Sequence, residues 1–214
     1  MMNRLVIVGA GGFGREMHSW VKTSPRWCQS FAIGSVVFVD DDVPKAPVRA
    51  PIISTVRDYR PADVDLVFCA IGAPSARREV SKLLSQRDAR MGTFVHDRAV
   101  LGDNVQLGRG SIVCPDVLIT CDVLIGENVH INIGSTIAHD VIIGDFVTVS
   151  PACNLNGNVK IEDGAFLGTG VTVIPGKSVG QNSLIGAGSL VLKNIPPQVT
   201  AFGNPCVIVG RRSA

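Results

Sequence analysis

The sequence of 214 residues has few aromatic side chains, no excess of charge and no long apolar run. Aromatic residues make up 5% of it, while glycine and valine are abundant, which suits a narrow, compact fold. Twenty basic residues balance 18 acidic ones without a basic block, so nucleic acid is not the expected partner. The longest apolar stretches are far shorter than the roughly 20 residues of a membrane-spanning helix. The first of them, residues 5–8, leads directly into a glycine loop, which argues against a secretory leader and for a cytoplasmic protein.

Motifs for metal binding and for covalent catalysis are also missing. The cysteines show no CxxC spacing, so we expect free thiols rather than metal ligands or disulfides. The six are Cys28, Cys69, Cys114, Cys121, Cys153 and Cys206. No two histidines have the HExxH spacing, and we expect no metal site. No GxSxG elbow supplies a nucleophile, so direct proton removal from an acceptor is the simplest chemistry.

An aliphatic residue occurs at every sixth position over much of the chain. Neither a helix, with 3.6 residues per turn, nor a strand, with a period of two, has this repeat. The sixteen residues are Leu101, Leu107, Val113, Ile119, Ile125, Ile131, Ile137, Ile143, Val149, Leu155, Ile161, Leu167, Val173, Val179, Ile185 and Val191. A small residue or valine precedes each by two positions, except at Lys177. A period of six is typical of a parallel β-helix with three units per coil, so the run predicts about five coils around a continuous core.

The segment before residue 95 instead predicts a small α/β unit. We expect strands at residues 5–8, 36–39 and 65–72, and helices at residues 15–22 and 76–86. Strands that alternate with helices form a parallel sheet, and ligands bind such sheets at the carboxyl ends of the strands. Three loops meet at that edge: Gly9 to Gly14, Asp40-Asp41 and Ile71-Gly72. We therefore place a nucleotide site there.

The loop from Gly9 to Gly14 matches GxGxxG between a strand and a helix. Glycines in such a loop let backbone N–H groups approach a phosphate at the N-terminus of the helix. Three interpretations are open: a nucleotide-sugar site, a tight strand-to-helix turn, or an NAD site with redox chemistry. We favour the nucleotide sugar, because the unit is about half the size of a full dinucleotide-binding domain and a coil follows it.

Among the four histidines, His139 has the position that fits a general base. It follows the core residue Ile137 by two places, so its side chain points outward, and Gly157 has the same phase 18 residues later. Coils stack at about 4.8 Å, so this glycine leaves an open groove beside the imidazole. Asp140 follows, and an imidazole next to a carboxylate is the ordinary arrangement of a general base. The alternative is a solvated histidine on the repeat surface. We expect His130 to pack at an interface.

The order of these parts resembles that of bacterial acetyltransferases that modify nucleotide-linked sugars for glycan or O-antigen assembly. The shared features are the GAGGFG loop, the VDDD and AIG strand ends, the hexapeptide coil, residues 135–140 and 157–161, and the GNP near the end. The group includes N-acetyltransferases of nucleotide-linked 4-amino-6-deoxy sugars and relatives of sialic acid O-acetyltransferases. The resemblance implies a Rossmann-like α/β half-domain over residues 1–95. It implies a left-handed parallel β-helix with a C-terminal cap over residues 96–214.

The same resemblance implies a homotrimer that binds acetyl-coenzyme A in the groove between the coils of two subunits. His139 matches the catalytic base, Asp140 the acidic neighbour that raises its basicity, and Asn132 a polar residue near the acceptor amine. The matching cofactor positions are Thr148, Gly157, Thr169 and Ala187. The nucleotide sugar would rest against Gly11, Gly12, Phe13, Gly14, Asp40, Asp41 and Gly72.

Two residues depart from the family pattern, because Phe13 and Thr148 stand where related enzymes often have histidine. The expected reaction transfers acetyl from acetyl-coenzyme A to a sugar amine, with His139 taking the proton and backbone N–H groups stabilising the oxyanion. Transfer to a sugar hydroxyl is the alternative reaction, and a non-catalytic structural trimer is the alternative outside enzymes. UDP, GDP and dTDP all stay open as the nucleotide.

Overall fold

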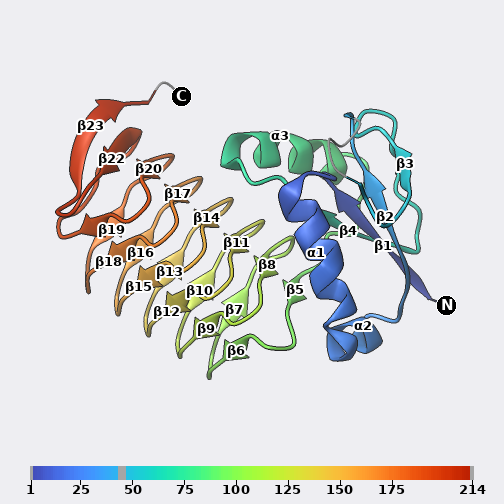
Figure 1. Cartoon of the computed structure of the whole chain (residues 1–214), viewed down its shortest axis with the longest axis horizontal. Helices are drawn as coiled ribbons and strands as arrows, with labels where there is room; N and C mark the ends of the chain where they lie inside the picture. The colour runs from blue at the N-terminus through green and yellow to red at the C-terminus, as the bar shows by residue number, and fades with distance from the viewer. Residues whose placement is uncertain (1, 43–46, 213–214) are drawn as a thin grey trace.

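The computed structural model describes residues 2–42 and 47–212, and the chain forms an α/β part followed by a coil of short strands (Figure 1). The α/β part is built on a four-stranded parallel sheet with the order β3-β2-β1-β4. Its elements are β1 (Asn3–Val8), α1 (Gly12–Lys22), α2 (Pro25–Ser30), β2 (Ile33–Val39), β3 (Ile52–Ser54), β4 (Asp65–Cys69) and α3 (Pro74–Ser85). The predicted fold class, an α/β unit followed by a parallel β-helix, is confirmed.

Hydrophobic clusters lie on both faces of this sheet, because side chains alternate along each strand. On one face, Met17 of α1 and Trp27 of α2 share a cluster with Leu5 of β1. That cluster continues through Phe94 into the coil, so the two parts of the chain share one core. On the other face, Leu84 of α3 belongs to a separate cluster with alternate residues of the same strands.

Several element bounds differ from those expected from the sequence. Helix α1 begins at Gly12, three residues earlier than predicted, so part of the glycine loop forms its first turn. Pro25 begins α2 instead of only ending α1, because a proline's missing N–H and restricted φ suit the first turn of a helix. The sequence analysis did not predict the three-residue strand β3.

The coil has three faces, in which two-residue strands pair in parallel with strands 18 residues away. Face 1 consists of β5 (Phe94–Val95), β8 (Ile112–Val113), β11 (His130–Ile131), β14 (Thr148–Val149), β17 (Phe166–Leu167), β20 (Leu184–Ile185) and β22 (Val199–Phe202). Face 2 consists of β6 (Val100–Leu101), β9 (Leu118–Ile119), β12 (Thr136–Ile137), β15 (Asn154–Leu155), β18 (Thr172–Val173) and β21 (Leu190–Val191). Face 3 consists of β7 (Gln106–Leu107), β10 (Leu124–Ile125), β13 (Ile142–Ile143), β16 (Lys160–Ile161) and β19 (Ser178–Val179).

The hexad residues fill the interior of the coil. Leu101 and Leu107, in the first coil, are half-buried, and the other fourteen of the sixteen are buried. Each strand therefore turns one aliphatic side chain to the axis, and burying such a side chain fully contributes about 1.5–3 kcal/mol.

The chain turns at residues with positive φ, which lie three places after each core residue from Leu101 to Ile185. They recur every six positions from Asn104 to Gly188. Glycine, asparagine and aspartate fill most of these positions, because they adopt the left-handed conformation at little cost. Asp140 is one of them, with φ +59°. Asp140 therefore also provides the left-handed backbone conformation that this turn needs.

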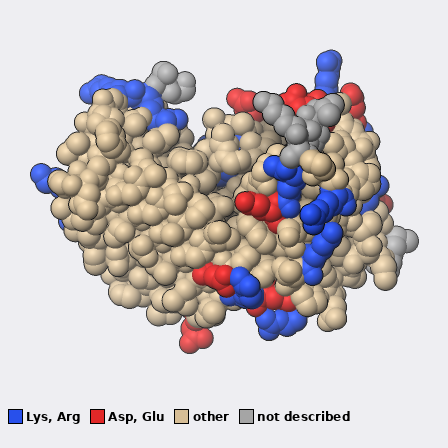
Figure 2. Space-filling model, in the orientation of Figure 1, with Lys and Arg blue, Asp and Glu red and all other residues tan. Residues whose placement is uncertain are grey.

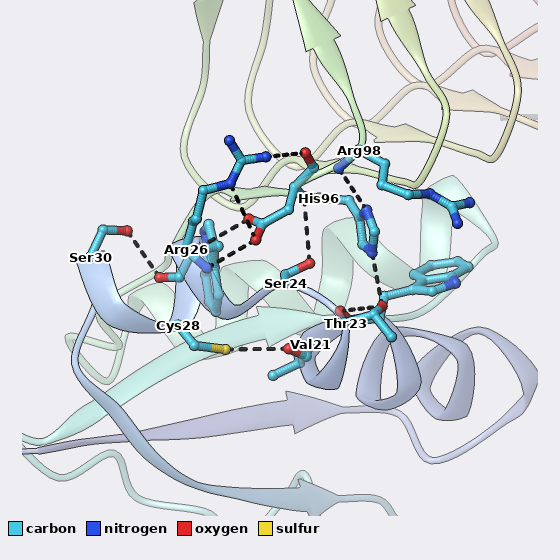
Figure 3. A network of polar contacts seen from close by, with 11 residues as sticks. Val21, Thr23, Ser24, Arg26, Cys28, Ser30, His96 and Arg98 are labelled. Atoms are coloured by element: carbon cyan, nitrogen blue, oxygen red, sulfur yellow. Dashed lines mark hydrogen bonds and ion pairs between the residues drawn. The ribbon is translucent and has the colours of Figure 1, made fainter.

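The start of the coil is tied to the α/β part by residues 93–98 (Figure 3). The Asp97 carboxylate accepts hydrogen bonds from the backbone N–H groups of Arg26 (2.9 Å) and Trp27 (3.1 Å), so it caps the N-terminus of α2. The Arg26 guanidinium donates to the Asp97 carbonyl, and the His96 ring lies 3.0 Å from the Thr23 hydroxyl. These contacts hold the first coil against the α1–α2 corner.

At the other end of the coil, β23 (Val207–Arg211) pairs antiparallel with β22. All five residues of β23 are exposed, so Val207, Ile208 and Val209 do not join the core of the coil. Over the described ranges the longest helix is α3, with 12 residues, and none of these helices is long and apolar enough to cross a membrane.

Candidate active site

A cavity of about 370 Å³ lies at the carboxyl ends of β1, β2 and β4, where the three predicted loops meet. Its lining residues are Gly9, Gly11, Gly12, Phe13, Asp40, Asp41, Asp42, Val56, Ala70, Ile71, Gly72 and Val80. The structure thus brings together six of the seven residues predicted to touch the nucleotide sugar. The seventh, Gly14, is buried beneath the loop and does not line the cavity.

The glycines of this loop have different reasons to lack a side chain. A Cβ at Gly14 would lie 1.8 Å from the Gly9 carbonyl oxygen, so the packing of the helix against the strand requires glycine there. A Cβ at Gly11, Gly12 or Gly72 would meet no atom within 4 Å, and none of the three has a positive φ. The fold does not require glycine at these three positions. Their bare backbone leaves room for a ligand to approach the N-terminus of α1.

Two acidic residues of the cavity also hold its loops. Asp40 accepts a hydrogen bond from the backbone N–H of Ala10 in the glycine loop, and another from Asp42 (3.0 Å). Asp41 accepts one from the backbone N–H of Val56 (2.7 Å). Both carboxylates therefore position the walls of the cavity as well as lining it.

His139 lies in the turn from β12 to β13, which we call the 2–3 corner because it joins faces 2 and 3. Its Nδ1 is 2.7 Å from Oδ2 of Asp140, and the two side chains are 57% and 55% exposed. Gly157 stacks against the ring from the next coil, where a Cβ would lie 2.6 Å from Cε1 and 2.7 Å from Nε2 of His139. The pair is thus hydrogen-bonded and accessible, and only a glycine fits beside it.

Three other predicted residues lie on a different corner of the coil. Asn132, Thr169 and Ala187 follow strands of face 1, in the turns that lead to face 2, which we call the 1–2 corner. Thr169 and Ala187 are exposed there, and the Asn132 amide donates to the Val149 carbonyl (2.8 Å). Within one chain, Gly157 therefore lies on a different corner from Thr169 and Ala187. Two residues 12 apart have the same position within a repeat unit but lie on different corners of the coil. Two residues 18 apart lie on the same corner.

Thr148 does not lie on either of these corners. It is 4% exposed and is buried between face 1 and the α/β part. Its hydroxyl donates to the Gly72 carbonyl (2.9 Å) and accepts from Nη2 of Arg77 (2.9 Å). The structure gives this residue an interface role and leaves it no open surface for a cofactor.

Arg77 and His130 form a buried polar cluster under the cavity, and the arginine was not among the predicted site residues. Nη1 of Arg77 lies 3.2 Å from Nδ1 of His130, and the His130 ring stacks on Phe13 with centroids 4.7 Å apart. Burial and the nearby guanidinium hold the pKa of His130 well below its ordinary value, so this imidazole is neutral. One signal was present in the sequence: Arg77 shares the helical phase of Val80 and Leu84, on the apolar side of α3.

Within the two described ranges, no group of three or more histidine, cysteine, aspartate or glutamate side chains is placed to hold a metal ion. All six cysteines lie in these ranges, and all are free thiols.

Comparison with known proteins finds solved structures that are similar over almost the whole chain. The family model described as the PglD N-terminal domain matches residues 4–84. WeeI from Acinetobacter baumannii AYE is 32% identical, and its solved structure superposes with a TM-score of 0.86 over 98% of this chain and 100% of that one. The chain belongs to the family of nucleotide amino-sugar N-acetyltransferases.

Two other solved structures of this family carry ligands. PerB from Caulobacter crescentus, in complex with CoA and GDP-perosamine, is 29% identical, with a TM-score of 0.85 over 98% of this chain and 99% of that one. The acetyltransferase domain of PglB from Neisseria gonorrhoeae FA1090, in complex with acetyl coenzyme A, is 25% identical, with a TM-score of 0.86 over 98% and 100%. The family thus includes structures with the donor and with an amino-sugar acceptor bound.

Curated relatives match only a short stretch. The galactoside O-acetyltransferase of Lactococcus lactis is 63% identical over 30 residues, which are 14% of this chain and 14% of that relative. Such a short match leaves the acceptor undefined.

Proposed function

We propose that this member of the family transfers an acetyl group from acetyl-coenzyme A to the C4 amine of a nucleotide-linked 4-amino-6-deoxy sugar, with His139 as the general base. The observation that carries the proposal is the His139–Asp140 pair, which is hydrogen-bonded, accessible and flanked by a glycine. PerB, which was solved with CoA and GDP-perosamine, supports the acceptor class.

The geometry of the pair assigns a role to each ring nitrogen. Asp140 accepts a hydrogen bond from Nδ1–H, so the lone pair of the neutral imidazole is on Nε2. Nε2 takes a proton from the amine as the amine nitrogen attacks the thioester carbonyl. The new C–N bond forms, the C–S bond breaks, and the leaving thiolate takes up the proton to give coenzyme A and the amide. Asp140 stabilises the imidazolium that forms between these steps.

The separation of the two corners supports a site that is assembled from two chains. His139 and Gly157 are on the 2–3 corner, whereas Asn132, Thr169 and Ala187 are on the 1–2 corner. In a cyclic trimer, the 2–3 corner of one chain can face the 1–2 corner of the next, because every interface joins two different surfaces. The α/β part contacts face 1 through His130 and Thr148. It contacts the turns from face 3 to face 1, which we call the 3–1 corner, through Asn128 and Phe146. The cavity of one chain therefore serves the base of its neighbour.

The surface of the coil supports such an assembly. Val100 and Leu118 of face 2 are 58% and 42% exposed, and Leu124 and Ile142 of face 3 are 43% and 45% exposed. Outward aliphatic residues repeated on two adjacent faces are typical of a surface that is covered in an oligomer. The side of the coil in view in Figure 2 carries few charged side chains.

The nucleotide sugar is assigned to the 370 Å³ cavity. Its diphosphate would lie at the bare N-terminus of α1, and the sugar would extend past Phe13 toward the coil. We also place the protein in the cytoplasm, since six free thiols suit a reducing compartment.

O-acetylation of a sugar hydroxyl is the second candidate, because the curated relatives include galactoside O-acetyltransferases. The same base would serve it. A hydroxyl is a weaker nucleophile than a neutral amine, so that reaction would depend even more on His139.

One assay tests the proposal and separates the two candidates. The protein is incubated with acetyl-coenzyme A and with UDP-, GDP- or dTDP-linked 4-amino-6-deoxy sugars, each beside its 4-hydroxy counterpart. Release of free thiol and mass spectrometry of the product are followed together. We expect thiol release and a product heavier by one acetyl group with an amino sugar only. Transfer to the hydroxyl sugars alone would establish O-acetylation, and no transfer to any acceptor would refute the proposal.

A further inference from the structure

Arg77 is the largest fully buried side chain of the described residues, with 0% of its surface exposed. Over residues 2–42 and 47–212, no carboxylate lies within ion-pair distance of its guanidinium. A buried cation without a counter-ion is costly, and it persists where many hydrogen bonds compensate it. The contacts of this arginine therefore indicate what it does.

The guanidinium binds two separate parts of the molecule at once. Its Nη1 donates to the carbonyls of Ile71 (2.7 Å) and Gly72 (3.1 Å), which are in the wall of the nucleotide-sugar cavity. The other two nitrogens donate to the coil. The acceptors are the carbonyls of Asn128 (2.9 Å), Phe146 (2.8 Å) and Val147 (3.1 Å) and the hydroxyl of Thr148 (2.9 Å). One side chain thus joins the cavity wall to two successive coils.

Thr148 and His130 complete this connection. The Thr148 hydroxyl donates to the same Gly72 carbonyl that Arg77 binds. Nε2–H of His130 donates to the Cys69 carbonyl at the end of β4 (3.0 Å), so its Nδ1 is left as an acceptor for Arg77. The His130 ring supports Phe13, on the opposite wall of the cavity.

We propose that Arg77 is a positioning residue for the nucleotide sugar: with Thr148, it holds the Ile71–Gly72 wall at a set distance from the coil. The guanidinium suits this task because its rigid, planar fork reaches acceptors on several segments, whereas a lysine ammonium has one nitrogen. The inference depends on the proposed function, since it takes the occupant of the cavity to be the sugar acceptor. It assigns Thr148 to that acceptor and not to acetyl-coenzyme A.

The Thr148→Val variant tests this most cleanly, because it keeps the shape of the side chain and removes its hydrogen bond to Gly72. We expect KM for the nucleotide sugar to rise about tenfold while KM for acetyl-coenzyme A stays unchanged. Ser81→Ala is the matched control: Ser81 is buried in the same interface and donates to Asn128 (3.1 Å), but it does not contact the cavity. Its KM values should equal those of the wild type.

Arg77→Lys should raise the same KM by a larger factor and also lower kcat, provided that it folds. Thr148→Val keeps the test valid if it does not. Calorimetric titration with GDP-, UDP- and dTDP-linked 4-amino-6-deoxy sugars separates the two proposals. Binding to wild type that weakens in Thr148→Val supports the inference. Equal binding of the nucleotide sugar to the wild type and to Thr148→Val overturns the inference, and so does a rise in KM for acetyl-coenzyme A only. Failure of the wild type to bind any of the three overturns the proposed function as well.

Discussion

Gly157 leaves the imidazole of His139 uncovered. The Gly157→Ala variant, which adds one methyl group, tests whether catalysis needs that open space. In Gly157→Ala the new Cβ would lie 2.6–2.7 Å from the ring, which must then rotate away. The φ of this residue is not positive, so alanine does not strain the backbone. We expect kcat to fall about tenfold or more, since a displaced base loses alignment with the amine. Gly210→Ala, where a Cβ would meet no atom, is the control. Full turnover in Gly157→Ala would contradict the role of this corner.

His139→Ala removes the proposed base itself. General-base catalysis contributes about 10²–10⁴-fold, so kcat should fall by that factor. The side chain is more than half exposed, so stability and acetyl-coenzyme A binding, followed by calorimetry, should be close to those of the wild type. A variant that keeps most of its turnover would exclude His139 as the base.

Buried histidines make the stability of the protein depend on pH. Burial lowers the pKa of His130 well below its ordinary value, and it lowers the pKa values of His18 and His96 as well. As the pH falls below about 6.5, the unfolded chain takes up protons that the folded protein excludes, so the free energy of unfolding decreases. The slope approaches about 1.4 kcal/mol per pH unit for a histidine that stays neutral in the folded protein, as we expect of His130.

Urea unfolding between about pH 7 and pH 5 measures this slope, above the range in which most carboxylates titrate. His130→Asn should give a smaller slope than the wild type, whatever its absolute stability. Equal slopes in the two proteins would show that His130 is protonated in the folded state.

Within a single strand of the coil, one residue faces the interior and its neighbour faces outward. In β16, Ile161 faces the axis and is 0% exposed, while Lys160 faces outward and makes only a long, exposed ion pair with Glu162 (3.8 Å). Ile161→Ala should lower the free energy of unfolding by about 2–5 kcal/mol, because it leaves a cavity in the coil. Lys160→Ala should leave it almost unchanged. Denaturant unfolding of the two variants at one protein concentration compares their free energies of unfolding. A similar decrease in both would contradict the assignment of Ile161 to the interior of the coil and Lys160 to its surface.

The elements also show how far the sequence could predict this structure. The period of six was sufficient for the core of the coil, because each repeat unit has the same local environment. The corners were harder to assign, because a corner repeats only every 18 residues: Gly157 and Thr169, which are 12 residues apart, lie on different corners of one chain. Arg77 was missed because a buried arginine opposes the usual pattern, and only its hydrogen bonds across the two parts explain it.

Several site residues were predictable for a physical reason. The carboxyl ends of parallel strands must share an edge, so the glycine loop, Asp40 and Gly72 line one cavity. The adjacent positions of His139 and Asp140 allowed their contact to be predicted. Thr148 shows the limit, because its environment depends on how the α/β part rests on face 1, and no periodicity encodes that.

At the scale of the whole molecule, we propose a cyclic trimer in which each active site joins the 2–3 corner of one chain to the 1–2 corner of another. Co-expression of two differently tagged variants, His139→Ala and Thr169→Trp, tests it most directly. The first lacks the base, and the second fills the 1–2 corner with a large side chain. Each should be inactive alone. Mixed trimers, purified through both tags, contain one site in three that combines two intact corners.

Turnover of acetyl-coenzyme A by these mixed trimers is therefore the decisive measurement. We predict about one third of the wild-type rate, because cyclic symmetry gives every mixed trimer one complete site. Mixed trimers as inactive as the two parents would contradict a site shared between chains.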